Sequence, residues 1–243
     1  MGEDIVKTTI HQPDFMPWYG LFSKISKSDC WIVLDHTHNN PKDASFWGRR
    51  VQILVNGKAH WLSIPLKKSS LKESFTQPIN QMVINTSDKK LFKKLQQTIK
   101  MSYIKTPYFK KYYYLVERYF NHSSDNLQRR NMEFIIEVMR ILKISTKIIY
   151  SSDFNFTTKK TELLIDLLKA TNSTTYLCGN GASGYQDDAL FAKHNISLEY
   201  NVVNHPIYKQ PFTSSCVQGL SILDLLFNMG EEKIIEHLQG EQR

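Results

Sequence analysis

The stretch IVKTTIHQPDFMPWYGLFSKISKSDCWIVLD, residues 5–35, decides the fold of this chain. It reads as a strand over 5–10, a polar turn over 11–17, a helix over 18–28 and a second strand over 30–35. Both strands are short, continuous apolar runs, which are typical of a sheet covered on both faces. The stretch therefore predicts a βαβ unit with two parallel strands and a right-handed crossover.

His11 and Gln12 leave the first strand at the sheet edge where Asp35 and His36 leave the second. In open α/β sheets this carboxyl edge is the usual ligand crevice. A histidine in such a turn suits a general base or a phosphate-binding donor, although it could also cap the helix or bond to backbone. Asp14 suits an N-cap better than an acid. We predict catalytic roles for His11, Asp35 and His36, with His11 as the general base.

A second unit is predicted in the later part of the chain, with a strand over 147–152, a helix over 161–170 and a strand over 174–178. A glycine-rich loop over 179–185 follows. It lacks the Lys-Ser/Thr of a P-loop and is not a dinucleotide fingerprint, so it suits either a backbone nest for an anion or a flexible connection. A further strand over 198–203 leads into His205.

Two different pieces separate the units. Asn56-Gly57 is a strong hairpin signal between apolar runs at 51–55 and 58–64, and one more strand is expected near 82–84. Three amphipathic helices then follow, at roughly 88–103, 108–121 and 126–143.

The chain thus predicts an α/β fold. We expect a Rossmann-like, mostly parallel sheet built from two βαβ units, with an inserted β-hairpin and a helical lobe. Residues 1–87 form the first half of the core with the hairpin, residues 88–145 the inserted helical lobe, and residues 146–243 the second half with C-terminal helices, the first near 220–227.

The composition of the chain limits the classes of partner and site that we expect. The 243 residues carry a formal net charge of +8, which favours anionic partners but does not choose among nucleotides, nucleic acid, phosphorylated carriers and a membrane surface. Lysines between 89 and 111 alternate with apolar residues near helical spacing, which indicates either a solvated helix face or a binding patch.

The three cysteines are far apart and the histidines lack a compact ligand spacing, so we expect neither a disulfide framework nor a metal site. With no apolar run long enough to span a membrane and no signal core, we expect a cytoplasmic protein without a membrane span.

The segment Trp47-Gly48-Arg49-Arg50 places two arginines beside an aromatic ring, which suits a phosphate or a carboxylate, although unpaired surface arginines are common. Cys178 is more typical of a buried strand cysteine than of a nucleophile. The residues predicted to bind substrate are Gln12, Asp14, Trp18, Tyr19, Trp47, Arg49, Arg50, Gly179, Asn180, Gly181, Tyr185 and His205.

Several motifs together resemble one known family. They are HQPDFMPW at 11–18, WLSIP at 61–65, QPIN at 77–80, TYLCG at 175–179 and LSILDLLFN at 220–228. With these motifs spread over nearly the whole chain, the sequence resembles the WbqC-like proteins. The family often has more asparagine around the arginine segment, and a serine where Cys178 stands.

The resemblance implies a role in bacterial surface polysaccharide synthesis, especially of O-antigen. It further implies a transferase that moves a glycyl or other acyl group onto the amine of a nucleotide-linked amino sugar. No tightly bound cofactor is expected, and the acyl donor would be a phosphopantetheine thioester on an acidic carrier protein, docking on the lysine-rich helix.

Two other classes of function stay open at this point. A nucleotide-activating ligase or nucleotidyltransferase would share the fold. A non-catalytic protein that binds anions or nucleic acid would explain the charge, but the chain has no recognised reader motif, which makes nucleic acid the weaker alternative. The sequence leaves the oligomeric state open.

Overall fold

The computed structural model describes residues 6–40, 42, 46–67, 76–179 and 186–241. Its centre is a five-stranded sheet in the order β7-β2-β1-β8-β9, and every neighbouring pair in it is parallel. The strands are β1 (Lys7–His11), β2 (Cys30–Val33), β7 (Lys147–Tyr150), β8 (Thr175–Gly179) and β9 (Ser197–Asn201). The predicted Rossmann-like α/β fold is confirmed.

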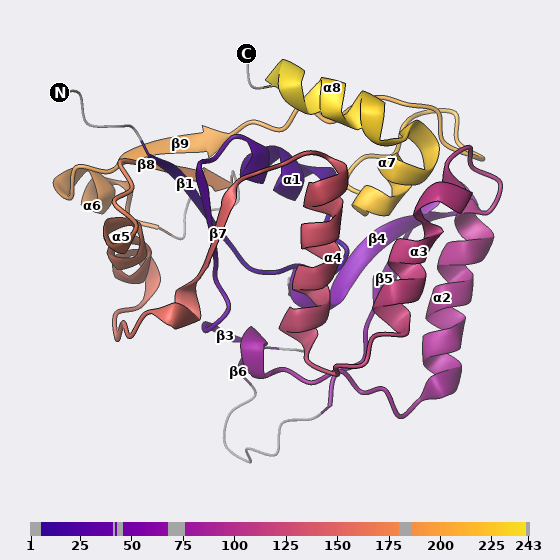
Figure 1. Ribbon diagram of the computed structural model, residues 1–243, viewed down its shortest axis with the longest axis horizontal. Coiled ribbons are helices and arrows are strands. Elements are labelled where there is room, and N and C mark those ends of the chain that lie inside the picture. The colour runs from indigo at the N-terminus through magenta and orange to yellow at the C-terminus, as the bar shows by residue number, and fades with distance from the viewer. Residues whose placement is uncertain (1–5, 41, 43–45, 68–75, 180–185, 242–243) are drawn as a thin grey trace.

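The sheet reverses its strand order between β1 and β8. From β1 the chain adds β2 and then β7 on one side, whereas β8 and β9 are added on the other side. Right-handed crossovers in opposite directions place their helices on opposite faces of the sheet. Accordingly α1 (Tyr19–Ser26) covers one face, and α5 (Lys160–Ala170) and α6 (Asp188–Lys193) cover the other (Figure 1). This reversal is the topological switch point, where open α/β sheets bind ligands.

Two hydrophobic cores follow from the alternation of side chains along the central strands. Trp31 and Val33 of β2 pack into the larger core with α1, whereas Cys30 and Ile32 pack into the smaller core with α5 and α6. Because successive residues of a strand point to opposite faces, one apolar run serves both cores.

The helical lobe packs against the larger core. Its helices are α2 (Lys89–Tyr103), α3 (Phe109–Phe120) and α4 (Leu127–Ile141), and each buries the apolar face that the periodicity predicts. The hairpin strands β4 (Arg50–Val55) and β5 (Lys58–Ser63) pair in antiparallel fashion around Asn56-Gly57, as expected, and both turn residues have positive φ. The boundaries proposed at 87/88 and 145/146 remain predictions.

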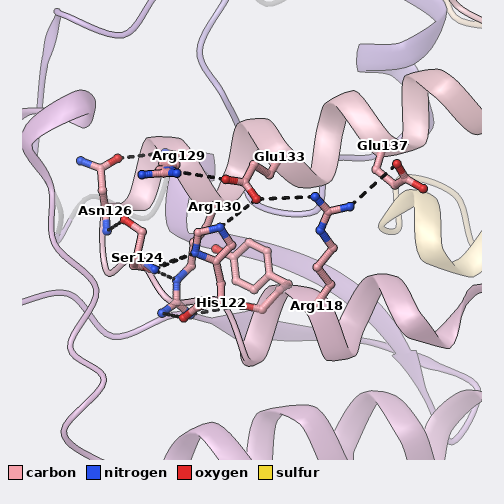
Figure 2. A network of polar contacts seen from close by, with 9 residues as sticks. Arg118, His122, Ser124, Asn126, Arg129, Arg130, Glu133 and Glu137 are labelled. Carbon is pink, nitrogen blue, oxygen red and sulfur yellow. Dashed lines mark hydrogen bonds and ion pairs between the residues drawn. The ribbon is translucent and has the colours of Figure 1, made fainter.

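A polar network joins α3 to α4 (Figure 2). The buried Arg130 donates to the backbone carbonyl of Tyr119 (3.1 Å) in the last turn of α3, and to that of His122 (3.0 Å) just beyond the helix. Glu133 of α4 lies 2.8 Å from Nε2 of His122, and its carboxylate also receives Arg129. Arg130 therefore supplies a donor to the Tyr119 carbonyl, which the end of α3 leaves without an intrahelical partner, and ties the following loop to α4.

Short elements complete the chain. They are η1 (Trp47–Arg49), β3 (His38–Asn39), β6 (Gln77–Pro78), η2 (Ile79–Gln81), η3 (Ser151–Asp153), α7 (Ile222–Met229) and α8 (Glu231–Glu241). The strand expected near 82–84 is wrong, because Val83 and Ile84 make only isolated bridges, to Asn126 and Leu66. No helix among the described residues is both long and apolar enough to cross a membrane.

Candidate functional site

The turn after β1 is held in an unusual conformation. Met16 is buried and has φ of 43°, in the left-handed region that bulky residues rarely adopt. Its carbonyl accepts the Ser221 hydroxyl (2.7 Å), and the carbonyl of Pro17 accepts the backbone N–H of Ile222 (2.8 Å). The start of α7 thus fixes the path of the chain from β1 into α1.

His11 lies at the end of β1, beside the switch point, with its side chain 35% exposed. Its Nδ1 is 3.1 Å from Nζ of Lys24, and its Nε2 is 3.0 Å from Oδ2 of Asp14. Burial, followed by the Lys24 ammonium, lowers the pKa of His11, so the ring is neutral at pH 7. Because an ammonium only donates, Nδ1 accepts from Lys24 and Nε2–H donates to Asp14. Both ring nitrogens are therefore occupied.

Lys24 is the residue of this cluster that sequence reasoning missed. It projects from α1, is only 5% exposed, and also approaches the carbonyl of Ile10 (3.4 Å). Burial lowers its pKa from 10.5 to about 8, while Asp14 acts in the opposite direction. The sequence could have indicated this residue. Lys24 is three residues after Leu21 and adjacent to Ile25 on the apolar face of the helix, where a lysine is unusual unless it has a buried partner.

Asp35 anchors a second cluster at the same edge. Its carboxylate receives the Ser151 hydroxyl (2.9 Å), both the backbone N–H (2.9 Å) and the hydroxyl (2.7 Å) of Ser152, and Nε2 of Gln128 (2.8 Å). Asp35 is 1% exposed, so this set of donors satisfies a buried polar group. Gln128 comes from α4, and its part in the cluster could not be foreseen because it depends on how the lobe packs.

His36 is oriented by this cluster. Its Nδ1 lies 2.6 Å from the Ser151 hydroxyl oxygen. Since that hydroxyl donates its proton to Asp35, the ring must donate through Nδ1–H, which leaves the lone pair on Nε2. Nε2 makes no hydrogen bond to any residue in the described part of the chain. His36 therefore carries an available basic nitrogen, supported by a serine and a carboxylate in series.

The predicted neighbourhood of His11 and Asp35 is confirmed for the backbone, because β1 and β2 are parallel neighbours with His11 opposite Val33. Their side chains nevertheless enter separate hydrogen-bond clusters. Gln12 reaches across this edge, with Nε2 donating to the Thr37 hydroxyl (3.1 Å) and to Oδ1 of Asn39 (3.0 Å).

The arginine segment lies against the opening turn. The backbone N–H of Phe15 donates to the carbonyl of Trp47 (3.0 Å). Nδ2 of Asn131, a fully buried residue of α4 that the sequence did not single out, donates to the carbonyls of Pro13 (2.8 Å) and Gly48 (2.7 Å). The Asn131 side chain therefore joins the opening turn, the arginine segment and helix α4 through hydrogen bonds.

Other predicted residues lie elsewhere. Trp18 is half-buried as the N-cap of α1, while Tyr19 is fully buried with its ring 5.9 Å from that of His205 and 5.6 Å from that of His237. Tyr19 and His205 thus contact each other under α8, and their substrate-binding roles stay predictions.

The glycine-rich loop is only partly described. Gly179 ends β8 with open space where a Cβ would stand, whereas Asn180, Gly181 and Tyr185 lie outside the described residues. Cys178 is fully buried and burial raises the pKa of its thiol, which agrees with a core cysteine. Within the described ranges, no group of three or more His, Cys, Asp or Glu side chains is arranged to hold a metal.

Fold and site together define an α/β protein with two histidine-centred polar clusters at the carboxyl edge of a switched parallel sheet. The model of the WbqC-like protein family matches residues 12–236, and the chain belongs to that family. It is 28% identical over 228 residues to the uncharacterized protein Rv1507c of Mycobacterium tuberculosis, covering 93% of this chain and 95% of that protein. No solved structure matches the chain.

Proposed function

We propose that the protein is a cytoplasmic transferase that moves a glycyl or other acyl group from a thioester to the amine of a nucleotide-linked amino sugar, in the synthesis of O-antigen or another surface polysaccharide. The observation that carries the proposal is Nε2 of His36, which has no hydrogen-bond partner among the described residues and lies on a ring oriented by Ser151 and Asp35 at the ligand edge of the sheet. Attack by an amine on a thioester needs a base of this kind to accept a proton.

The proposed chemistry balances with one proton acceptor. The amine nitrogen forms a bond to the acyl carbon and the carbon–sulfur bond breaks. His36 Nε2 takes the proton that the amine loses, and the departing thiolate then takes a proton from the resulting imidazolium. Asp35 accepts the Ser151 hydroxyl in a hydrogen bond, so it stabilises that imidazolium through Ser151 without itself moving a proton.

The His11 cluster has a different role in this proposal. Nδ1 of His11 accepts from Lys24, and its Nε2–H donates to Asp14, so the ring has no lone pair available for a substrate proton. We therefore assign to His36 the role of general base that the sequence analysis gave to His11. The Asp14 side chain, 11% exposed, supplies an oxygen that accepts a hydrogen bond from the incoming neutral amine of the amino sugar. His11 positions that side chain.

The acyl donor is proposed to arrive on an acidic carrier protein. Lys89, Lys90, Lys93 and Lys94 of α2 are exposed, on the side opposite to the buried Phe92 and Leu95. This arrangement bears out the amphipathic pattern and gives a basic helix face to which an acidic carrier is complementary.

The test is acyl transfer followed by mass spectrometry, with acyl-pantetheine and acyl-carrier thioesters as donors and a panel of nucleotide-linked amino sugars as acceptors. His36→Asn keeps a donor near the position of Nδ1 but removes the base, so we expect kcat to fall by roughly 10²- to 10⁴-fold with an unchanged Tm. The matched variant His11→Asn should retain more activity.

If His11→Asn loses more activity than His36→Asn, the general base is His11. Full activity in both would remove histidine catalysis from the proposal. Pyrophosphate release from a nucleoside triphosphate, with no acyl transfer by the wild type, would replace the transferase by a nucleotide-activating enzyme.

A further inference from the structure

Two tryptophans lie together on the outer surface of the hairpin. The rings of Trp47 in η1 and Trp61 in β5 have centroids 5.3 Å apart and an interplanar angle of 53°. Their exposed fractions are 42% and 38%, respectively. The guanidinium carbon of Arg50 is 3.7 Å from the centroid of the Trp61 ring, in a cation–π contact. A paired and charged aromatic surface of this kind is a better indication of binding than a single exposed apolar residue.

The pairing register of β4 and β5 explains why Arg50 and Trp61 lie on the outer face of the hairpin. Arg50 is opposite Ser63 and Gln52 is opposite Trp61, which makes Arg50 and Trp61 diagonal neighbours on one face of the two-stranded ladder. The other face carries Val51 and Leu62, both buried in the larger core. The alternation that buries the apolar residues therefore turns the aromatic and cationic residues outward.

Arg49 adds an unsatisfied group beside this surface. Its Nη1 donates to the carbonyl of Ile64 (3.3 Å), whereas its buried Nε has no partner among the residues that the structure describes. Burial, and after it the adjacent Arg50, lowers the pKa of Arg49. Arg49 therefore places a half-buried guanidinium with an unused donor beside the tryptophans, and a guanidinium suits an anionic group. The Phe15–Trp47 backbone hydrogen bond connects this surface to the opening turn.

We propose that Trp47, Trp61 and Arg50 form a stacking subsite for the planar base of a nucleotide, with Arg49 donating to its phosphates. The inference rests on the proposed function, because it names the residues that hold the nucleotide part of the substrate. Every nucleobase has a π face for tryptophan, and a stacked guanidinium strengthens such contacts. A pyranose ring would also stack on tryptophan, but it lacks the anionic group that the arginines favour.

Calorimetry on the full chain tests this subsite with UDP, UMP, ADP, inorganic pyrophosphate and free glucosamine as probes. We expect Trp61→Ala and Trp47→Ala to weaken binding of the nucleotides by roughly 5- to 150-fold, the range for loss of one base–aromatic stack. Trp61→Phe should retain most of the affinity. Pyrophosphate binding should be unchanged in Trp61→Ala and weaker in Arg49→Ala. Tyr114→Ala, which removes an aromatic ring of the same 38% exposure from α3, is the control.

The subsite is wrong if the wild type binds none of the nucleotides, if both alanine variants bind them as the wild type does, or if Trp61 is needed for glucosamine alone. Circular dichroism and Tm establish that each variant is folded. Acyl-transfer assays separate this inference from the proposed function. Transfer with an unchanged KM for the nucleotide sugar in Trp61→Ala would refute the subsite alone. Trp61-dependent nucleotide binding without any transfer would refute the transferase alone.

Discussion

Replacement of Lys24 by methionine should change how the stability of the protein depends on pH. Methionine is unbranched like the apolar stem of lysine and nearly as long, but carries no charge. In the folded protein burial holds the Lys24 pKa at about 8, against 10.5 for an ordinary lysine. The unfolded chain therefore binds a proton at Lys24 more tightly than the folded chain does, and the free energy of unfolding rises with pH between these two values.

The magnitude follows from the size of that pKa difference. One pKa unit corresponds to about 1.4 kcal/mol, so complete titration is worth roughly 3 kcal/mol. Integrated from pH 7 to pH 9.5, the gain of the wild type from Lys24 is about 2 kcal/mol. Because Lys24 is only 5% exposed, solvent screening reduces this value little.

Urea unfolding at a series of pH values measures the effect as the difference between wild type and Lys24→Met. Titrating groups away from Lys24 contribute equally to both proteins and cancel, whereas His11, whose pKa Lys24 lowers, contributes differently to the two. We expect the stability of the wild type relative to Lys24→Met to increase steadily from pH 7 to pH 9.5. Lys94→Met, on the exposed face of α2, controls for the loss of one positive charge. A difference that stays flat across this range would show that Lys24 is not held in a desolvated, charged state at neutral pH.

Two further substitutions test local features of the structure. Asn131→Leu should destabilise the protein by about 2–4 kcal/mol in urea unfolding, because the buried carbonyls of Pro13 and Gly48 each lose their donor; a loss below about 1 kcal/mol would show that these carbonyls find other partners. Lys143→Gly should raise stability by about 0.5–1 kcal/mol, since this exposed residue directly follows the C-cap of α4 with φ of 57°, a conformation that glycine adopts without strain; an unchanged or lower Tm would contradict this interpretation of the helix end.

The sequence predicted the parallel sheet and its ligand edge because both depend on local patterns. Short apolar strands around an amphipathic helix allow few arrangements, and handedness removes most of these. The proton positions at the site depend instead on contacts between distant segments. Ser151 orients His36 across 115 positions of sequence, and Gln128 reaches Asp35 across 93. No spacing rule links such residues, so the sequence favoured His11 although its nitrogens are occupied.

Lys24 and Asn131 illustrate two different reasons for a missed residue. Lys24 could have been found, because a lysine on the apolar face of a helix needs a buried partner. Asn131 could not, because its carbonyl partners come from two loops whose approach is decided by the packing of α4. Local rules therefore identify the sheet edge, whereas tertiary packing selects which groups at that edge have a free lone pair.

The Asn131 junction has a consequence for the entropy of binding. One amide group holds the backbone at Pro13 and at Gly48, while its oxygen accepts the hydroxyl of Tyr119 in α3. The opening turn and the start of the arginine segment therefore cannot move separately. Their backbone order is established when the chain folds, so a ligand that contacts both segments loses less conformational entropy of the protein on binding. For such a ligand, we expect selectivity to come from the shape and charge of a preformed surface.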